Sequence, residues 1–164
     1  MRIQEPASPT DVLGLGIAFA AGGGYFILVA MGVLPQPSES VARAPTAIIV
    51  AIGLAFLFAG LTCVVRARVG ATALDSDLPA GAPRWARLSY RALAIGTAGA
   101  LATIGAWIAI GSGPRLFGGS IDGLSPAGET IGRAVFALGT VIALIYVLAL
   151  TVGTVRKFFG RSGG

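Results

Sequence analysis

The chain has 164 residues, of which 55% are hydrophobic and only 12% are charged, and its formal net charge is +5. A water-soluble domain usually carries about 25% charged residues, so this composition excludes an ordinary globular surface and predicts that much of the chain faces lipid. The chain has no histidine and one cysteine, Cys63, which excludes a histidine-ligated zinc or haem site, a Ser-His-Asp triad and an intrachain disulfide.

Four stretches without a charged side chain predict four membrane-spanning helices. They are Val12–Leu34, Thr46–Val65, Ala92–Gly111 and Ala134–Val155, and each has at least 20 residues. An α-helix needs about 20 residues to cross about 30 Å of hydrocarbon. The sequence therefore predicts an all-α membrane protein, a four-transmembrane-helix antiparallel bundle. We expect one integral membrane domain, residues 1–164, with spans at about 12–34, 46–65, 88–111 and 132–155.

The first span, 12–34, follows a short N-terminal tail. Thr10 or Asp11 is expected to cap its helix by offering a side-chain oxygen to free backbone N–H groups. Pro35 and Pro37 are expected to end it, because proline cannot continue the hydrogen-bond ladder. Since the apolar run is longer than the core of a typical secretory signal, we expect this span to be retained.

The second span follows the loop 35–45, and Pro45 suits the first turn of its helix. Arg66 and Arg68 close this span, where cations meet the negative end of the helix dipole. The loop 66–87 leads to the third span, whose helix is expected to start near Arg84, before its apolar part.

The fourth span follows the loop 112–131. Ser125 is expected to cap its helix, and Pro126 suits the first helical position. Glu129 and Arg133 are then partners four residues apart, and an exposed pair of this kind contributes at most a few tenths of a kcal/mol.

Small residues recur four apart in two spans and predict surfaces for close helix packing. Such residues leave a flat groove in which two backbones approach closely, so dispersion contacts replace contacts with lipid. Either the bundle uses these grooves internally, or a partner subunit covers one of them. The residues are Gly14, Ala18 and Gly22 with Gly16, Ala20 and Gly24 beside them, and Ala92, Gly96 and Ala100.

A basic and aromatic cluster precedes the third span and indicates contact with lipid headgroups. Its arginines share one helical face. Anionic headgroups attract such residues by about 1 kcal/mol each, and interfacial aromatic side chains act as anchors. Generic anchoring and a specific lipid or partner site both remain open. The predicted anchoring residues are Arg84, Trp85, Arg87, Tyr90 and Arg91, with Arg156 and Lys157 near the C-terminus.

The distribution of basic residues predicts the orientation. Nine lie on one side of the membrane and three on the other: Arg2, Arg66, Arg68, Arg84, Arg87, Arg91, Arg156, Lys157 and Arg161 against Arg43, Arg115 and Arg133. Basic residues prefer the cytoplasmic side, so both termini and the loop 66–87 are predicted to be cytoplasmic, and the loops 35–45 and 112–131 outside. This placement explains the net charge without nucleic acid. The abundance of Arg over Lys, with much Ala and Gly, is typical of a GC-rich bacterial genome, so we expect a bacterial inner (plasma) membrane.

No catalytic constellation can be assembled from this sequence. Asp75 and Asp77 resemble a paired-carboxylate metal motif, but hard cations want about six oxygen ligands and few are nearby, so we expect a solvated loop. The glycines from Gly111 to Arg115 fit no nucleotide-binding fingerprint. Threonines inside the spans are expected to donate hydrogen bonds to their own helices. We therefore expect no cofactor and no metal.

The leading functional hypothesis is a non-catalytic membrane subunit or scaffold that packs against other membrane proteins or against itself. The alternative is a small subunit of a transporter or channel that works as an oligomer or with a larger partner. Such proteins usually carry a charged group inside the membrane, and the four apolar stretches contain none. An enzyme acting on lipid is a weaker third hypothesis, because no acid–base pair sits at a defined spacing.

Overall fold

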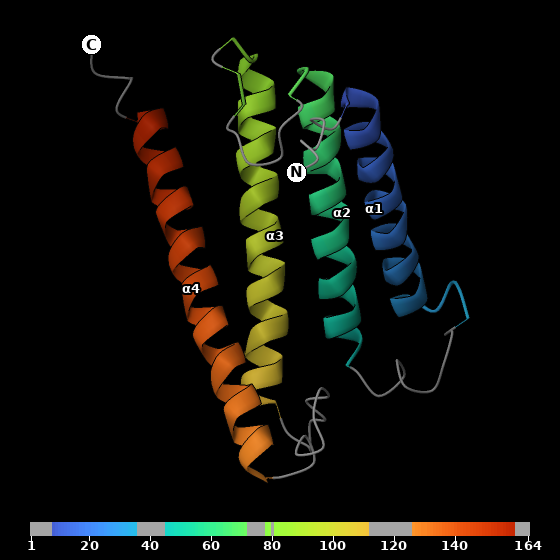
Figure 1. Cartoon of the computed structure of the whole chain (residues 1–164), viewed down its shortest axis with the longest axis vertical. Helices are drawn as coiled ribbons and strands as arrows, with labels where there is room; N and C mark the ends of the chain where they lie inside the picture. The colour runs from blue at the N-terminus through green and yellow to red at the C-terminus, as the bar shows by residue number, and fades with distance from the viewer. Residues whose placement is uncertain (1–7, 36–44, 72–77, 80, 112–125, 160–164) are drawn as a thin grey trace, which may run out of the picture. The chain divides into compact units, whose positions relative to one another are not determined.

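The computed structural model describes residues 8–35, 45–71, 78–79, 81–111 and 126–159. These residues form four α-helices and no strand: α1 (Pro9–Ala30), α2 (Thr46–Arg68), α3 (Arg84–Ile110) and α4 (Pro126–Phe159) (Figure 1). Each helix is long and apolar enough to cross a membrane. The prediction of an all-helical chain with four apolar helices of membrane-spanning length is confirmed.

α1 begins at a capping box one turn before its apolar part. Ser8 is the N-cap, and its Oγ accepts a hydrogen bond from the Asp11 backbone N–H at 3.2 Å. The Asp11 carboxylate accepts in return from the Ser8 backbone N–H at 3.1 Å. Each residue thus satisfies an N–H group that has no partner inside the helix. The predicted caps, Thr10 and Asp11, lie inside the first turn, because Pro9 takes the first helical position, where its missing N–H is not needed.

α1 ends at Ala30, four residues before the predicted limit of 34. Gly32 has φ +73°, a conformation open to a residue without a Cβ. The N–H groups of Gly32 and of the residue after it donate to carbonyls of the last turn at 3.0 and 2.9 Å. This Schellman motif ends the helix. Pro35, predicted to end it, lies beyond the turn, and Pro37 lies outside the described residues.

α2 starts at Thr46, with Pro45 as its N-cap residue, not inside its first turn. At its other end Gly70, with φ +71°, makes a second Schellman turn, in which the Ala71 N–H donates to the Arg66 carbonyl at 3.0 Å. Arg66 and Arg68 therefore belong to the last turn of α2 and not to the loop 66–87.

α3 and α4 extend past the limits predicted for their spans. α3 runs from Arg84, as expected from its polar start, so residues 84–87 are helical. α4 has 34 residues and begins at Pro126, the predicted first helical position, which lies six residues before the predicted span limit of 132. Ser125, its predicted cap, lies outside the described residues. The predicted limits differ from the observed helix ends because they come from the uncharged stretches, which show where the chain can enter hydrocarbon. A helix continues beyond such a stretch as long as its backbone hydrogen bonds continue.

The chain divides into two compact units, Met1–Thr97 and Ala98–Gly164, and the boundary falls inside α3. That the chain is one integral membrane domain stays a prediction. The N-terminal unit holds α1, α2 and the first part of α3, and the C-terminal unit holds the rest of α3 and α4. In the N-terminal unit α1 and α2 lie side by side and run in opposite directions, since residue 16 meets residue 60 and residue 23 meets residue 53 (Figure 1).

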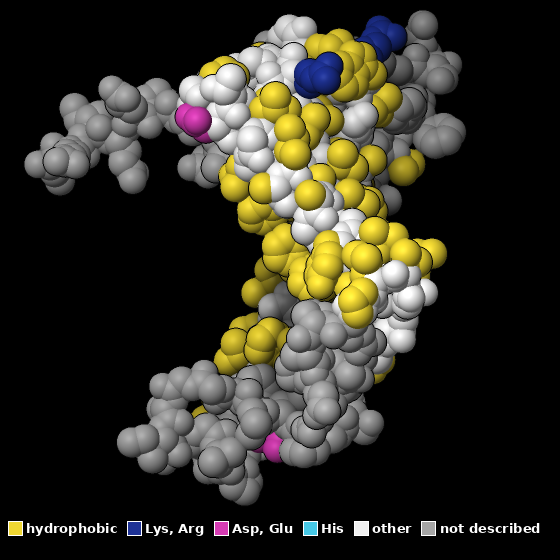
Figure 2. Space-filling view, turned by 90° about the vertical axis from the view of Figure 1, so that its right-hand side faces the viewer, with side chains coloured by type: hydrophobic (Ala, Val, Ile, Leu, Met, Phe, Trp, Pro, Cys, Tyr) yellow, Lys and Arg dark blue, Asp and Glu magenta, His cyan; other side chains and the backbone are white. Residues whose placement is uncertain are grey.

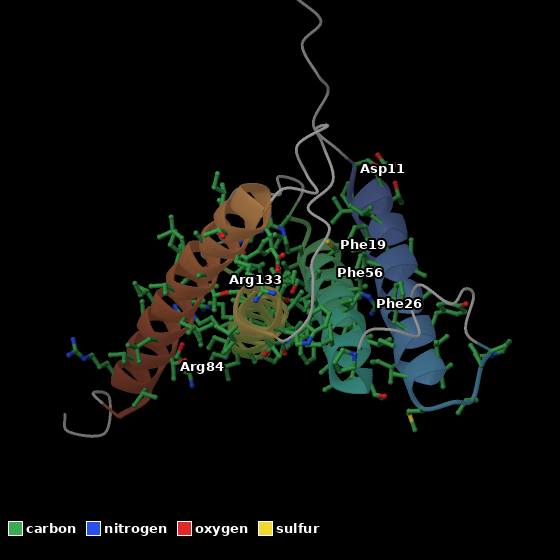
Figure 3. All side chains as sticks on the ribbon, turned by 90° about the horizontal axis from the view of Figure 1, so that it is seen from below. Asp11, Phe19, Phe26, Phe56, Arg84 and Arg133 are labelled. Atoms are coloured by element: carbon green, nitrogen blue, oxygen red, sulfur yellow. The ribbon has the colours of Figure 1, made fainter. Side chains whose placement is uncertain are left out.

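Aromatic and branched side chains flank the contact between α1 and α2. The Phe56 ring of α2 lies 5.4 Å from the Phe19 ring and 6.1 Å from the Phe26 ring of α1, centroid to centroid (Figure 3). Val12 and Val29, near the two ends of α1, are 2% and 1% exposed. The N-terminal unit is thus packed along the full length of α1.

Large apolar side chains cover much of the surface. The apolar stretch of α4 within Glu129–Arg156 contains no buried residue. Leu138, Ile145 and Leu148 illustrate this, each with more than 60% of its surface exposed. The face drawn in Figure 2 is likewise mostly hydrophobic where it is described. In water this exposure would be unfavourable by about 25 cal/mol per Å², so the surface suits hydrocarbon.

Candidate functional site

Four glycines form the contact line between α1 and α2, and we name them the glycine seam: Gly16 and Gly23 of α1, Gly53 and Gly60 of α2. A Cβ added at Gly16 would lie 2.8 Å from the Gly60 carbonyl oxygen, and one at Gly23 would lie 2.5 Å from the Gly53 carbonyl oxygen. Real Cβ atoms do not come this close to a backbone, so larger residues require the helices to separate. Close backbone approach is the packing mode that holds helices together in lipid.

The sequence prediction missed three members of the glycine seam. Gly23, Gly53 and Gly60 do not follow the four-residue spacing used to find packing grooves. Their spacing is seven residues, from Gly16 to Gly23 and from Gly53 to Gly60. A seven-residue repeat keeps positions on one side of a helix over two turns. Two matching repeats in consecutive apolar helices were therefore the available signal.

The predicted small residues of α1 separate into two sets. Gly16 and Ala20 face α2: a Cβ added at Gly60 would lie 2.9 Å from the Ala20 Cα. A Cβ added at Gly14, Gly22 or Gly24 would meet no atom within 4 Å. We name Gly14, Ala18 and Gly22 the open groove, because Gly14 and Ala18 are exposed and Gly22 is half-buried. α1 therefore uses one line of small residues for α2 and leaves another uncovered.

The predicted small residues of α3 do not act as one line. Gly96 faces α2, where an added Cβ would lie 2.7 Å from Cδ2 of Phe58, whereas Ala92 is exposed and Ala100 is half-buried. In the C-terminal unit, a Cβ added at Gly105 would lie 2.5 Å from the Thr140 hydroxyl oxygen of α4.

The members of the predicted anchoring cluster at the start of α3 differ in exposure. Arg84, Trp85 and Arg87 are exposed, with Trp85 at 55%, whereas Tyr90 and Arg91 are half-buried. Arg87 Nε donates a hydrogen bond to the carbonyl of residue 82 at 3.0 Å, which holds its side chain at the start of the helix.

The other predicted anchors lie at the end of α4. Arg156 is exposed there, and the side chain of Lys157 falls outside the part of the chain that the structure describes. The anchoring role of these residues stays a prediction.

Arg66, in the last turn of α2, is buried, with 2% of its surface exposed. Its guanidinium carbon lies 5.9 Å from the centre of the Tyr90 ring. A cation held near an aromatic ring is attracted by the ring's negative face. This contact brings the end of α2 next to the start of α3 within the N-terminal unit. Arg66 and Tyr90 lie on different helices and meet only because α2 packs against α3. No local sequence pattern therefore predicts their contact.

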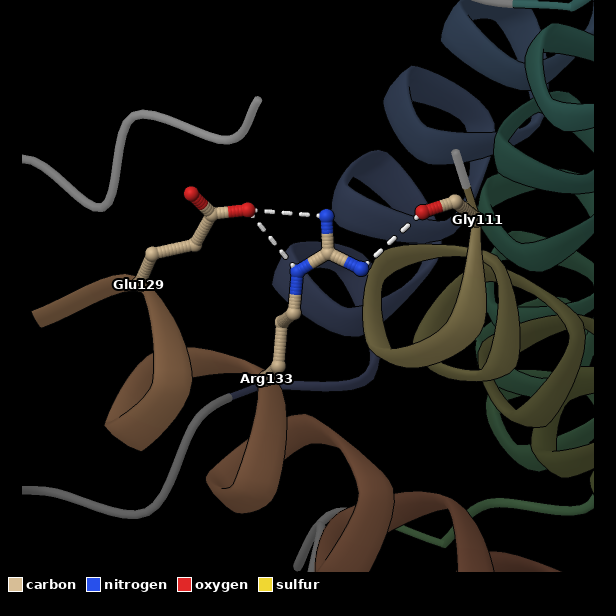
Figure 4. Close-up of polar contacts among 3 residues, drawn as sticks. All are labelled: Gly111, Glu129 and Arg133. Carbon is tan, nitrogen blue, oxygen red and sulfur yellow. Dashed lines mark hydrogen bonds and ion pairs between the residues drawn. The ribbon is translucent and has the colours of Figure 1, made fainter. Parts of the chain in front are cut away.

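Arg133 connects α4 to the last turn of α3 in the C-terminal unit (Figure 4). Its Nη2 lies 2.8 Å from Glu129 Oε1, and its Nε donates to the same oxygen at 3.0 Å. Its Nη1 donates to the Gly111 carbonyl oxygen at 3.0 Å, which satisfies an acceptor at the C-terminal end of α3. The predicted Glu129–Arg133 pair is therefore present and also joins two helices, which the sequence prediction missed.

Hydroxyl groups inside the helices donate to the carbonyl four residues earlier, as the sequence predicts. The O···O distances run from 2.7 to 2.9 Å. These hydroxyls satisfy their donors locally and need no polar partner in the membrane. The residues are Thr62, Thr97, Thr103, Thr140, Thr151 and Thr154.

Among the described residues, no group of three or more Cys, Asp and Glu side chains is placed to hold a metal ion. Asp75, Asp77 and Arg115 lie outside these residues. The chain matches no protein-family model, no curated protein and no solved structure. The surfaces of the described helices are suited to close packing and to contact with lipid.

Proposed function

We propose that this chain is a non-catalytic integral membrane protein, a subunit or scaffold that packs against copies of itself or against another membrane protein. The open groove of α1 is the observation that carries this proposal. Small residues four apart let a second backbone approach closely, and in lipid this shape complementarity drives association. Because α2 already occupies the glycine seam on the same helix, the open groove is available to a partner.

The proposed architecture is a four-helix antiparallel bundle in a bacterial inner membrane, with both termini and the loop 66–87 in the cytoplasm. The glycine seam supports opposite directions for α1 and α2. The Arg66–Tyr90 contact supports opposite directions for α2 and α3. The hydrogen bond between Arg133 and the Gly111 carbonyl supports opposite directions for α3 and α4. The excess of Lys and Arg on one side supports the orientation.

The alternative, a small transporter or channel subunit, would use the same open groove to form an oligomer. Its uncharged pathway would rely on the span hydroxyls. Because these donate to their own helices, they are less suited to replace the hydration shell of a solute, and we place the packing role first. A flux assay in liposomes separates the two proposals, since only the alternative requires solute movement.

Cysteine cross-linking tests the open groove. In a Cys63→Ala background, we expect Gly14→Cys, Ala18→Cys and Gly22→Cys to form intermolecular disulfides in oxidised native membranes. Ile17→Cys is the matched control, because Ile17 is 57% exposed on the same helix but lies off the groove. A groove that gives no more product than this control would contradict self-association through the open groove and would leave only packing against a different membrane protein.

A further inference from the structure

Four arginines and two apolar side chains lie together at one end of the N-terminal unit, and we name them the interfacial arginine patch. Its members are Arg68, Arg84, Trp85, Arg87, Leu88 and Arg91. Trp85 is 55% exposed and Leu88 is 42% exposed, whereas Ala86 on the opposite face of α3 is fully buried. The exposed side of the first turns of α3 is thus basic and apolar at once.

Helix packing adds α2 to this patch. Phe58 of α2 meets Gly96 of α3, and eight residues further along α2 the Arg66 guanidinium lies 5.9 Å from the Tyr90 ring. The two helices therefore run in opposite directions here, and the last residue of α2, Arg68, lies at the same end as Arg84. The patch is a two-helix feature and not only a property of one segment.

The charge of the patch is not balanced by the acids that the structure describes in this unit. The single described carboxylate of the N-terminal unit is Asp11, which is held in the capping box by Ser8. Arginines at the start of α3 also oppose the positive end of its helix dipole. An anionic ligand from outside the chain would reduce two unfavourable interactions: the repulsion between neighbouring arginines, and the repulsion between the arginines and the positive end of the helix dipole.

We propose that the interfacial arginine patch binds the phosphate groups of anionic phospholipids in the leaflet at this end of the spans. Guanidinium groups are planar and present several N–H donors that match phosphate oxygens. Trp85 and Leu88 lie between the arginines, at the point where α3 passes into the uncharged stretch Ala92–Gly111. This order of basic, aromatic and apolar groups matches the layers of a bilayer and favours a lipid over a soluble polyanion. The inference rests on the membrane-spanning part of the proposed function.

Quenching of Trp85 fluorescence tests this proposal on the full chain. The chain has two tryptophans, so a Trp107→Phe variant leaves Trp85 as the probe. The protein is placed in phosphatidylcholine bilayers that contain 20 mol% (about one lipid in five) of either brominated phosphatidylglycerol or brominated phosphatidylcholine, with bromine near the headgroup end. We expect brominated phosphatidylglycerol to be enriched around Trp85 on the order of fivefold, because one arginine near an anionic headgroup suffices for that preference.

Two variants distinguish the patch from general attraction to positive charge. Arg84→Gln with Arg87→Gln should remove the preference. Arg43→Gln, which changes an arginine of the loop 35–45 predicted to lie on the other side of the membrane, should retain it. Equal quenching by the two brominated lipids in the Trp107→Phe protein would overturn the patch while leaving the membrane spans in place. A Trp85→Phe variant leaves Trp107 as a second probe. If neither brominated lipid quenches Trp85 in the first variant or Trp107 in the second, the proposal that the chain spans a membrane is overturned.

Discussion

Gly22 and Gly23 are neighbours in α1, and only Gly23 contacts another helix. A Cβ at Gly23 would lie 2.5 Å from the Gly53 carbonyl oxygen, and one at Gly22 would meet nothing within 4 Å. Successive residues of a helix point about 100° apart, so one faces the glycine seam and the other the open groove. The pair offers a matched comparison in which helix propensity is the same and packing differs.

We predict opposite effects for Gly23→Ala and Gly22→Ala. Gly23→Ala should lower the free energy of unfolding by about 1–3 kcal/mol, because overpacking forces two backbones apart. Gly22→Ala should be neutral or stabilising by up to about 1 kcal/mol, because alanine favours the helix. Cys63 reports the transition: it is half-buried, and its Cβ lies 2.9 Å from a Cβ built at Gly16. A thiol-reactive dye in mild detergent gives the unfolding temperature. The same temperature for both variants would show that the seam is not tightly packed.

Arg133 connects elements and not only neighbouring residues. The side chains of Arg133 and Glu129 are 28% and 32% exposed, so water still screens their ion pair and the pair alone is weak. The bond to the Gly111 carbonyl adds a charge-assisted contact at the end of α3, where the last carbonyls lack partners inside the helix. One side chain therefore joins the first turns of α4 to the end of α3.

We predict that Arg133→Met destabilises the C-terminal unit more than Glu129→Gln does. Arg133→Met removes both contacts and should lower the free energy of unfolding by about 1–2 kcal/mol. Glu129→Gln keeps the donor to Gly111 and should change it by less than about 1 kcal/mol. Trp107 fluorescence in a Trp85→Phe background follows the transition, because the Trp107 carbonyl accepts from the Gly111 N–H at 2.8 Å. Equal effects of the two substitutions would mean that the hydrogen bond from Arg133 to the Gly111 carbonyl does not contribute to the free energy of unfolding.

At the scale of the whole molecule, four apolar helices combine with an unequal distribution of basic residues. An even number of spans returns the chain to the side on which it began. Because Lys and Arg are in excess at the end of α2, the start of α3 and the end of α4, we predict that this side faces the cytoplasm.

We predict that both ends of the chain lie in the cytoplasm. A reporter that fluoresces only in the cytoplasm should be active at either terminus, and a reporter that requires export should be inactive at both. Fusions within the loops 35–45 and 112–131 serve as controls, and they should show the opposite pattern. Termini in different compartments would mean that one of the four helices does not cross the membrane.

Much of the fold follows from the sequence, because solvation by hydrocarbon is a local requirement. A run of about 20 uncharged residues must be a helix that satisfies its own backbone when it crosses lipid. The start of α3 at Arg84 and of α4 at Pro126 also followed from local rules. The ends of α1 were predicted less well: Ser8 was passed over for Thr10 and Asp11, and Gly32, which lies inside the apolar run, was passed over for the prolines that follow the run.

The sequence by itself determined that this chain is helical, apolar and suited to lipid, since composition and charge-free length decide those properties residue by residue. Only the tertiary structure decided which small residues meet, because contact depends on the direction and register of two helices. It assigned Gly16 and Gly23 to α2, left Gly14, Ala18 and Gly22 open, buried Arg66 beside Tyr90 and extended Arg133 to Gly111. In lipid, where apolar surface alone does not choose a partner, such shape complementarity decides the packing.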